Sequence, residues 1–155
     1  MRKLLSAFVA LSLLAAAPSA HAQVIDYQSS DNAMNAAIAK ARGSLATFDE
    51  AFRAKSAERY SVKVAIPASG GGNEHIWMDV TGIEGGEYRG RIANRPVRIP
   101  KMQRGDSYRA KADRISDWAH VQGGKMHGHY TTRVMLKDLP PEQARELQGQ
   151  MAPLP

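Results

Sequence analysis

One short segment, Tyr60–Ile66, constrains the fold more than any other, because its side chains alternate strictly in character. Larger apolar residues are separated by smaller or polar ones: Tyr60, Val62, Val64 and Ile66 alternate with Ser61, Lys63 and Ala65. A period of two is the repeat of a β-strand with one buried face. Pro67 ends this strand, and the three glycines at 70–72 favour a flexible reversal over an anion-binding loop.

Similar alternation predicts further strands along the chain. We expect them over residues 74–81, 87–93, 108–112 and 115–121, several of them separated by glycine pairs. Residues 97–99 lie between two prolines and predict a short edge segment, because proline cannot donate a hydrogen bond into a central ladder. Residues 126–136 fit both a strand and a helix, and we favour a strand.

Two helices are expected beside these strands. Between Ser30 and Lys55 the apolar residues recur at intervals of three and four: Met34, Ile38, Ala41, Leu45, Phe48 and Phe52. This spacing predicts one amphipathic helix, with Ser30 or Asp31 as its N-cap. A second, short helix begins at Pro140–Pro141 and ends near Gly149, before a loose tail. The fold class is therefore α+β: an N-terminal amphipathic helix packed on a curved, mainly antiparallel sheet of five or six strands, with a short C-terminal helix.

The first 22 residues have the features of a secretory signal peptide. Arg2 and Lys3 precede an apolar run, and Ala20-His21-Ala22 has the small-x-small pattern of a cleavage site. We therefore expect a signal peptide over 1–22, cleaved near Ala22, and one domain over 23–155 that is periplasmic or secreted and not anchored in the membrane. The chain contains no cysteine, which excludes disulfides, thiol catalysis and cysteine-bound metals.

Basic residues are concentrated between positions 87 and 114. Nine of them outnumber Glu87, Asp106 and Asp113: Arg89, Arg91, Arg95, Arg98, Lys101, Arg104, Arg109, Lys111 and Arg114. Strand periodicity places Arg89 and Arg91 on one outer face, and Arg109 on the face of the next strand, where guanidinium groups suit carboxylates or phosphates. The alternative is a solvated face whose charges prevent aggregation at the sheet edge.

The two tryptophans, Trp77 and Trp118, fall out of phase with the aliphatic residues of their strands. They predict either an exposed aromatic binding surface or two packed, hydrogen-bonded indoles. The packed arrangement requires a sheet that is covered on both faces or closed into a small barrel, and we favour it.

Histidines suggest a metal site. His127 and His129 are two residues apart, so a strand would place both imidazoles on one face, with His75, Asp79 or His120 completing a zinc shell. No HExxH motif supports this site, and a solvated strand face is favoured. Ser116 and Asp117, with His120 nearby, lack the context of a nucleophile elbow and are better explained as turn or capping residues.

Four runs of sequence carry a resemblance: E-H-I-W-M-D at 74–79, G-R-I-A-N-R-P-V at 90–97, I-S-D-W at 115–118 and G-K-M-H-G-H-Y-T at 124–131. In order and spacing they resemble the YegJ-like family of small bacterial proteins, whose domain has no known function. The resemblance implies kinship and carries over no catalytic residue. The family more often has small or polar residues where this chain has His127 and His129, which argues against a shared metal role.

These features favour a noncatalytic periplasmic interaction module over an enzyme. Its basic face, with Trp77 or Trp118, would bind an acidic protein or an envelope polyanion, and an inhibitory or immunity-like role is one form of this hypothesis. No cofactor and no nucleic acid is expected, and the sequence does not set the oligomeric state. The alternative hypothesis is a hydrolytic or metal-dependent envelope enzyme that uses His75, Asp79, His127 and His129.

Overall fold

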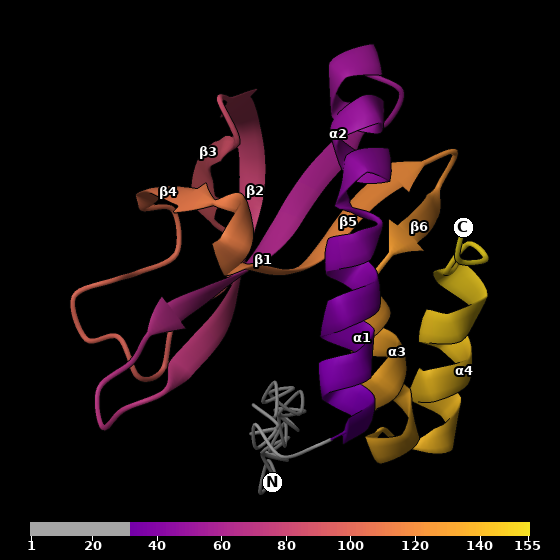
Figure 1. Ribbon diagram of the computed structural model, residues 1–155. Coiled ribbons are helices and arrows are strands. Elements are labelled where there is room, and N and C mark those ends of the chain that lie inside the picture. Colours follow the sequence, from indigo (N-terminus) through magenta and orange to yellow (C-terminus); the bar gives the residue numbers. More distant parts are fainter. Residues whose placement is uncertain (1–31) are drawn as a thin grey trace, which may run out of the picture.

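The alternating segments form one open, six-stranded antiparallel sheet in the computed structural model, which describes residues 32–155 (Figure 1). The strands are β1 (Arg59–Pro67), β2 (Asn73–Glu84), β3 (Glu87–Ile92), β4 (Ser107–Lys111), β5 (Ile115–Gln122) and β6 (Lys125–Gly128). They lie in the order β4-β3-β2-β1-β5-β6. The predicted α+β class is confirmed, and a closed barrel is excluded because β4 and β6, the two ends of this sheet of residues 32–155, do not pair with each other. The predicted signal peptide and the predicted N-cap at Ser30 or Asp31 lie outside the described residues.

Within residues 32–155, four α-helices accompany the sheet: α1 (Asn32–Gly43), α2 (Leu45–Ala54), α3 (Tyr130–Met135) and α4 (Pro141–Gln150). Two short 3₁₀ helices, η1 (Ala112–Arg114) and η2 (Leu136–Asp138), connect strands and helices. In Figure 1, α1 runs beside α3 and both lie near β5, and these elements are in contact.

The prediction of one helix between Ser30 and Lys55 was wrong, because the helix breaks at Ser44. The backbone of Ser44 leaves the helical region (φ −107°, ψ 11°). Its hydroxyl lies 2.8 Å from the Tyr130 hydroxyl and accepts a hydrogen bond from the Trp118 indole at 3.1 Å. The break therefore serves tertiary contacts that the helical spacing of the sequence does not reveal.

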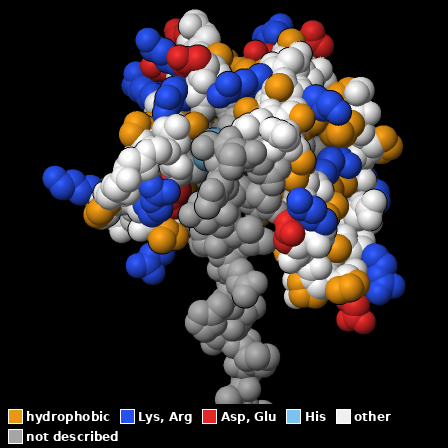
Figure 2. Space-filling model, turned by 60° about the horizontal axis from the view of Figure 1, so that its bottom comes forward, with side chains coloured by type: hydrophobic (Ala, Val, Ile, Leu, Met, Phe, Trp, Pro, Cys, Tyr) orange, Lys and Arg blue, Asp and Glu red, His pale blue; other side chains and the backbone are white. Residues whose placement is uncertain are grey.

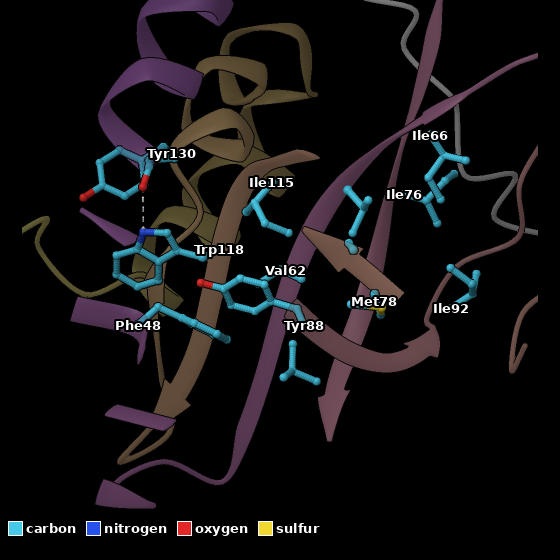
Figure 3. Packing of buried hydrophobic residues seen from close by; sticks show 14 of the residues in the cluster. Phe48, Val62, Ile66, Ile76, Met78, Tyr88, Ile92, Ile115, Trp118 and Tyr130 are labelled. Atoms are coloured by element: carbon cyan, nitrogen blue, oxygen red, sulfur yellow. Dashed lines mark hydrogen bonds between the residues drawn. The ribbon is translucent and has the colours of Figure 1, made fainter. Parts of the chain in front are cut away.

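The hydrophobic core lies between the sheet and the helices α1 and α2. Phe48 from α2 is fully buried against β1, where Val62 and Val64 are also buried. Figure 3 shows Phe48 from α2, Tyr88 from β3 and Trp118 from β5 lying close together over β1. The side of β1 that carries the larger apolar residues faces this core, as the alternation predicts.

Trp118 belongs to this core, so the hypothesis that it forms part of an exposed binding surface was wrong. Its side chain is 1% exposed, and its indole N–H donates to the backbone oxygen of Ala41 at 3.1 Å. The register between β1 and β5 shifts between Lys63 and Val64, so that both Ile115 and Trp118 face the core. This bulge explains why a strict period of two places Trp118 on the wrong face.

The favoured strand over 126–136 was also wrong beyond Gly128. The chain changes direction at His129, whose backbone has the left-handed conformation (φ 56°). Helix α3 begins at the next residue. Gly128 itself has φ 77°, and a Cβ there would stand 2.6 Å from an indole carbon of Trp118. Helix α3 forms because the Asp117 carboxylate accepts hydrogen bonds from the first N–H groups of the helix, those of Tyr130 and Thr131.

The predictions for the end of the C-terminal helix, for the tail that follows it and for residues 97–99 were wrong. The C-terminal helix passes through Gly149 to Gln150, and Met151 and Ala152 are buried rather than loose. The backbone N–H of Ala152 donates to Met126 at 2.9 Å, which ties the tail to β6. No strand forms at residues 97–99, since the Glu74 carboxylate accepts hydrogen bonds from the N–H groups of Val97 and Arg98 at 2.7 and 2.8 Å.

Candidate functional site

The sheet face opposite the core contains a shallow pocket of about 300 Å³. Its floor is a row of small side chains that the strand register places side by side, since Ser61 lies opposite both Asp79 and Ala119, and Ala119 lies opposite Gly128. Larger residues flank this row. The pocket is lined by Arg59, Ser61, Trp77, Asp79, Ala93, Asn94, Ala119, His120, Val121, Met126 and His129.

Trp77 and His129 form one wall of this pocket. Their ring centroids are 5.1 Å apart, and the rings are inclined by 52°. The backbone N–H of Trp77 donates to the side-chain oxygen of Asn94 at 2.8 Å, which links β2 to the loop 93–106. On the floor, the hydroxyl of Ser61 donates to the Asp79 carboxylate at 2.8 Å. Trp77 is thus the tryptophan that contributes to a surface site.

A buried charge network lies next to this wall. The ammonium group of Lys63 donates to the Thr131 hydroxyl at 2.6 Å, and that hydroxyl donates to the Asp117 carboxylate. The Lys63 ammonium also lies 4.8 Å from the centroid of the Trp77 ring. Burial lowers the pKa of Lys63, while the Asp117 charge acts in the opposite direction.

His129 is neutral at neutral pH. Its pKa is lowered to about 4, mainly by burial and to a lesser extent by the nearby cations Lys63 and Arg133, while the Asp117 carboxylate acts in the opposite direction. Its Nδ1 lies 3.2 Å from the Thr132 hydroxyl. A left-handed backbone is uncommon for any residue other than glycine, so the surrounding structure must hold His129 in this position.

The structure does not bring together the metal ligands suggested by the sequence. His127 stacks on His120 with 4.7 Å between ring centroids, whereas His129 contacts Trp77. His75 is engaged with the Ser116 hydroxyl at 2.8 Å, and Asp79 accepts from Ser61. Across residues 32–155, no three His, Cys, Asp or Glu side chains are grouped so that they could hold a metal ion.

The reason is the turn at Gly128 and His129, which ends β6. Because the strand does not continue, a two-residue spacing no longer places His127 and His129 on one face.

Ser116 and Asp117 are fully buried. Asp117 caps α3, as the capping interpretation expects, and the Ser116 hydroxyl donates to the Lys63 carbonyl at 3.2 Å.

The predicted basic face is divided by the structure into two groups. Arg89 and Arg109 lie opposite one another on β3 and β4 and both pair with acidic residues: Arg89 with Glu84 and Glu87, and Arg109 with Glu87 at 3.5 Å. Arg91 is exposed, and its guanidinium group donates to the backbone oxygen of Gly105 at 3.1 Å. Arg89 and Arg109 are therefore partly neutralised, whereas Arg91 has no carboxylate partner among residues 32–155.

Arg91, near the end of β3, precedes three exposed cations of the loop 93–106. We call these four residues the loop cations: Arg91, Arg95, Lys101 and Arg104. Within the described part of the chain, no carboxylate pairs with any of them at 4.0 Å or less. Figure 2 shows blue basic side chains spread over the lobe at the left, where this loop and the tip of the β1–β2 hairpin project. No acidic residue occurs between Tyr88 and Gly105.

Several site residues were not singled out from the sequence: Lys63, Thr131 and Asn94. Lys63 occupies a polar position in the alternation of β1 and looks there like a solvated side chain. Only the cross-strand register, which sets Lys63 beside both Trp77 and Asp117, shows that it is buried. Asn94 has no sequence signal, because its role depends on how the loop folds back on β2.

No helix in the described part of the chain has the length and apolar character needed to cross a membrane. A bacterial family described as "Uncharacterized protein conserved in bacteria (DUF2314)" matches residues 31–152. The Escherichia coli K12 protein described as "Uncharacterized protein YegJ" is 33% identical over 119 residues, which are 77% of this chain and 77% of that protein.

A putative ankyrin repeat protein of Neisseria meningitidis serogroup B is 30% identical over 73 residues, which are 47% of this chain and 29% of that protein. No solved structure gave a significant match. The match over residues 31–152 includes the pocket, the buried charge network and the loop cations. The chain therefore belongs to the DUF2314 family of bacterial proteins, and YegJ of Escherichia coli is similar to it.

Proposed function

We propose that this protein is an exported, noncatalytic binding module that recognises an acidic protein in the periplasm. The observation that carries the proposal is the group of loop cations, which are exposed and unpaired among the described residues. Exposed guanidinium groups that lack an internal carboxylate are available to carboxylates of a partner. The leader at residues 1–22 supports export, because its charged start, apolar run and cleavage pattern are those of a signal peptide.

The loop that carries the cations is held in place, which favours specific binding over general attraction. Glu74 fixes the backbone at Val97 and Arg98, and the N–H of Ser69 donates to the Arg98 carbonyl at 2.9 Å. A loop fixed at these points loses little conformational freedom when a partner binds. A protein partner is favoured over a simple polyanion because the pocket beside Trp77 offers apolar surface next to the loop cations.

The test is affinity capture from an envelope extract with residues 23–155, compared between two charge-reversal variants. In the first, Arg91→Glu, Arg95→Glu and Arg104→Glu change three of the four loop cations. In the second, the same charge change is placed at exposed positions away from the loop: Lys40→Glu, Arg53→Glu and Lys137→Glu. Circular dichroism confirms that both variants are folded.

We expect an acidic protein to be retained by the native chain and by the second variant and lost by the first, with retention falling as salt rises. Equal retention by both variants would refute the proposal. Binding of the native chain to vesicles that contain phosphatidylglycerol, without a protein partner, would also refute it. Detection of residues 23–155 in the periplasm, with cleavage after Ala22, tests the export part separately.

A further inference from the structure

The pocket on the exposed sheet face has small residues at its floor and larger residues around them, and its shape suits a single side chain. The small residues Ser61 and Ala119 leave a hollow at its floor. Trp77, His129 and Met126 surround this hollow with two rings and a thioether. Aromatic and thioether groups pack well against another aromatic ring, and such pockets hold the side chains that contribute most to protein interfaces.

The size of the pocket limits what it can hold. About 300 Å³ lies at the lower end of the range for ligand pockets, which suits one side chain rather than a large cofactor. Asp79 provides a hydrogen-bond acceptor beside the floor, and one of its oxygens already accepts from Ser61. A phenol hydroxyl has the complementary donor, so tyrosine fits the chemistry of the lining.

The walls of the pocket are held in place before any partner arrives. Lys63 lies against the ring of Trp77, and Asn94 holds the backbone of Trp77. On the other side, the turn at Gly128 and the Asp117 carboxylate fix the start of α3 and with it His129. Fixed walls reduce the entropy that is lost on binding.

The charged residues at the rim of the pocket indicate which residues would flank a bound tyrosine side chain. Arg59 lines the pocket, and Arg91 lies opposite Asp79 in the register of β2 and β3. Arg91 is also the first of the loop cations, so the pocket and the cationic loop form a continuous surface. A segment that inserts an aromatic ring here therefore meets positive charge on its flanks, which favours acidic neighbours.

We infer that this pocket binds one aromatic side chain, preferably tyrosine, from an acidic segment of the protein partner. The inference rests on the proposed function and adds the anchor to it. Electrostatic attraction to the loop cations then brings the segment to the surface, and insertion of the ring beside Trp77 and His129 provides specificity.

Three labelled peptides test this inference by fluorescence anisotropy with residues 23–155. The first is an acidic peptide with one central tyrosine, the second has alanine in place of the tyrosine, and the third has the tyrosine between lysines. Two variants, Ala119→Leu and Ser61→Leu, each fill the floor of the pocket. Ala54→Leu, at an exposed position on α2, is the matched control.

We expect the native chain and Ala54→Leu to bind the acidic tyrosine peptide at least tenfold more tightly than the other two. Ala119→Leu and Ser61→Leu should lose the preference for tyrosine and keep the salt-dependent binding of the acidic peptides. Equal binding of the tyrosine and alanine peptides by the native chain would overturn the inference and leave the proposed function intact.

Two further outcomes are informative. If the native chain binds none of the acidic peptides and captures no acidic protein, the proposed function fails together with the inference. If the tyrosine peptide binds only after Tyr27→Ala, the occupant of the pocket is the chain's own segment 23–31, where Tyr27 follows Asp26, and the inference is overturned.

Discussion

Lys63 and Asp117 face one another across β1 and β5, and the hydroxyl of Thr131 lies between their charged groups. Lys63 donates to this hydroxyl at 2.6 Å, and the hydroxyl donates to the Asp117 carboxylate. Both residues are buried, so each charge depends on the other for compensation. The same pair holds Trp77 on one side and the start of α3 on the other, which connects the stability of the fold to the shape of the pocket.

Removal of one member of this pair should destabilise the protein strongly. We expect Lys63→Met to lower the free energy of unfolding by about 3 kcal/mol, because it leaves a buried carboxylate without its cation. The double variant Lys63→Met/Asp117→Asn should lose less than the sum of the single variants. Urea unfolding of the four proteins gives the coupling energy, and additive losses would show that the two charges are independent.

Gly128 should tolerate no side chain. Gly128→Ala is expected to cost about 3 kcal/mol or more, because the added Cβ would meet both the carbonyl and the indole ring of Trp118. Gly124→Ala is the matched control, since Gly124 has a similar φ of 71° but open space around it. Gly124→Ala should therefore cost only the strain of a left-handed backbone, about 1 kcal/mol. Equal losses in thermal unfolding would contradict the close contact.

Stability should decrease as the pH is lowered from 7 to 4. His129 has a pKa of about 4 in the folded protein, against 6.5 for an unperturbed histidine. Between these values the unfolded chain binds a proton that the folded chain does not, so the free energy of unfolding falls by up to about 3 kcal/mol on acidification. Urea unfolding at a series of pH values measures this slope.

His129→Asn identifies the source of that slope. Asparagine adopts the left-handed backbone more readily than most residues and does not titrate in this range. The variant should lose part of the pH dependence and retain the part due to His75 and His120, whose pKa values are also lowered, mainly by burial. An unchanged slope would show that His129 is not held neutral in the folded state.

The two tryptophans should differ in solvent access. The variant Trp77→Phe keeps only Trp118, which is 1% exposed, so its fluorescence should be blue-shifted and resist quenching by acrylamide. Trp118→Phe should lower the free energy of unfolding by about 2 kcal/mol, because it removes the hydrogen bond to Ala41 and leaves unfilled space in the core. Easily quenched emission from Trp77→Phe would contradict the burial of Trp118.

Local pattern was sufficient to predict most of the secondary structure. The strands β1, β2 and β3 follow from alternation between apolar and polar residues, which depends only on the geometry of a strand. The errors at Ser44 and His129 have a common cause. Ser44 is held by contacts with Tyr130 and Trp118, and His129 follows Gly128, which must approach Trp118 closely. Contacts between distant parts of the chain override local periodicity at both positions.

The candidate site was predictable only in part. The sequence drew attention to Trp77, Asp79 and His129, and to the basic residues, because of their chemistry. The prediction that His127 and His129 lie on one face of a strand was wrong, because the turn after β6 separates the two side chains. The pairing of Arg89 and Arg109 with glutamates likewise depends on which strands are neighbours.

The α+β class, the strand periodicity and the bias towards basic residues between positions 87 and 114 can be predicted from the sequence, because each depends on the order of residues along the chain. Which polar residues are buried and which cations remain exposed depends instead on how the strands pack. Register sets Lys63 beside Trp77 and Asp117 and leaves a hollow over Ser61 and Ala119. Burial and charge compensation arise between strands, and only the folded sheet fixes those neighbours.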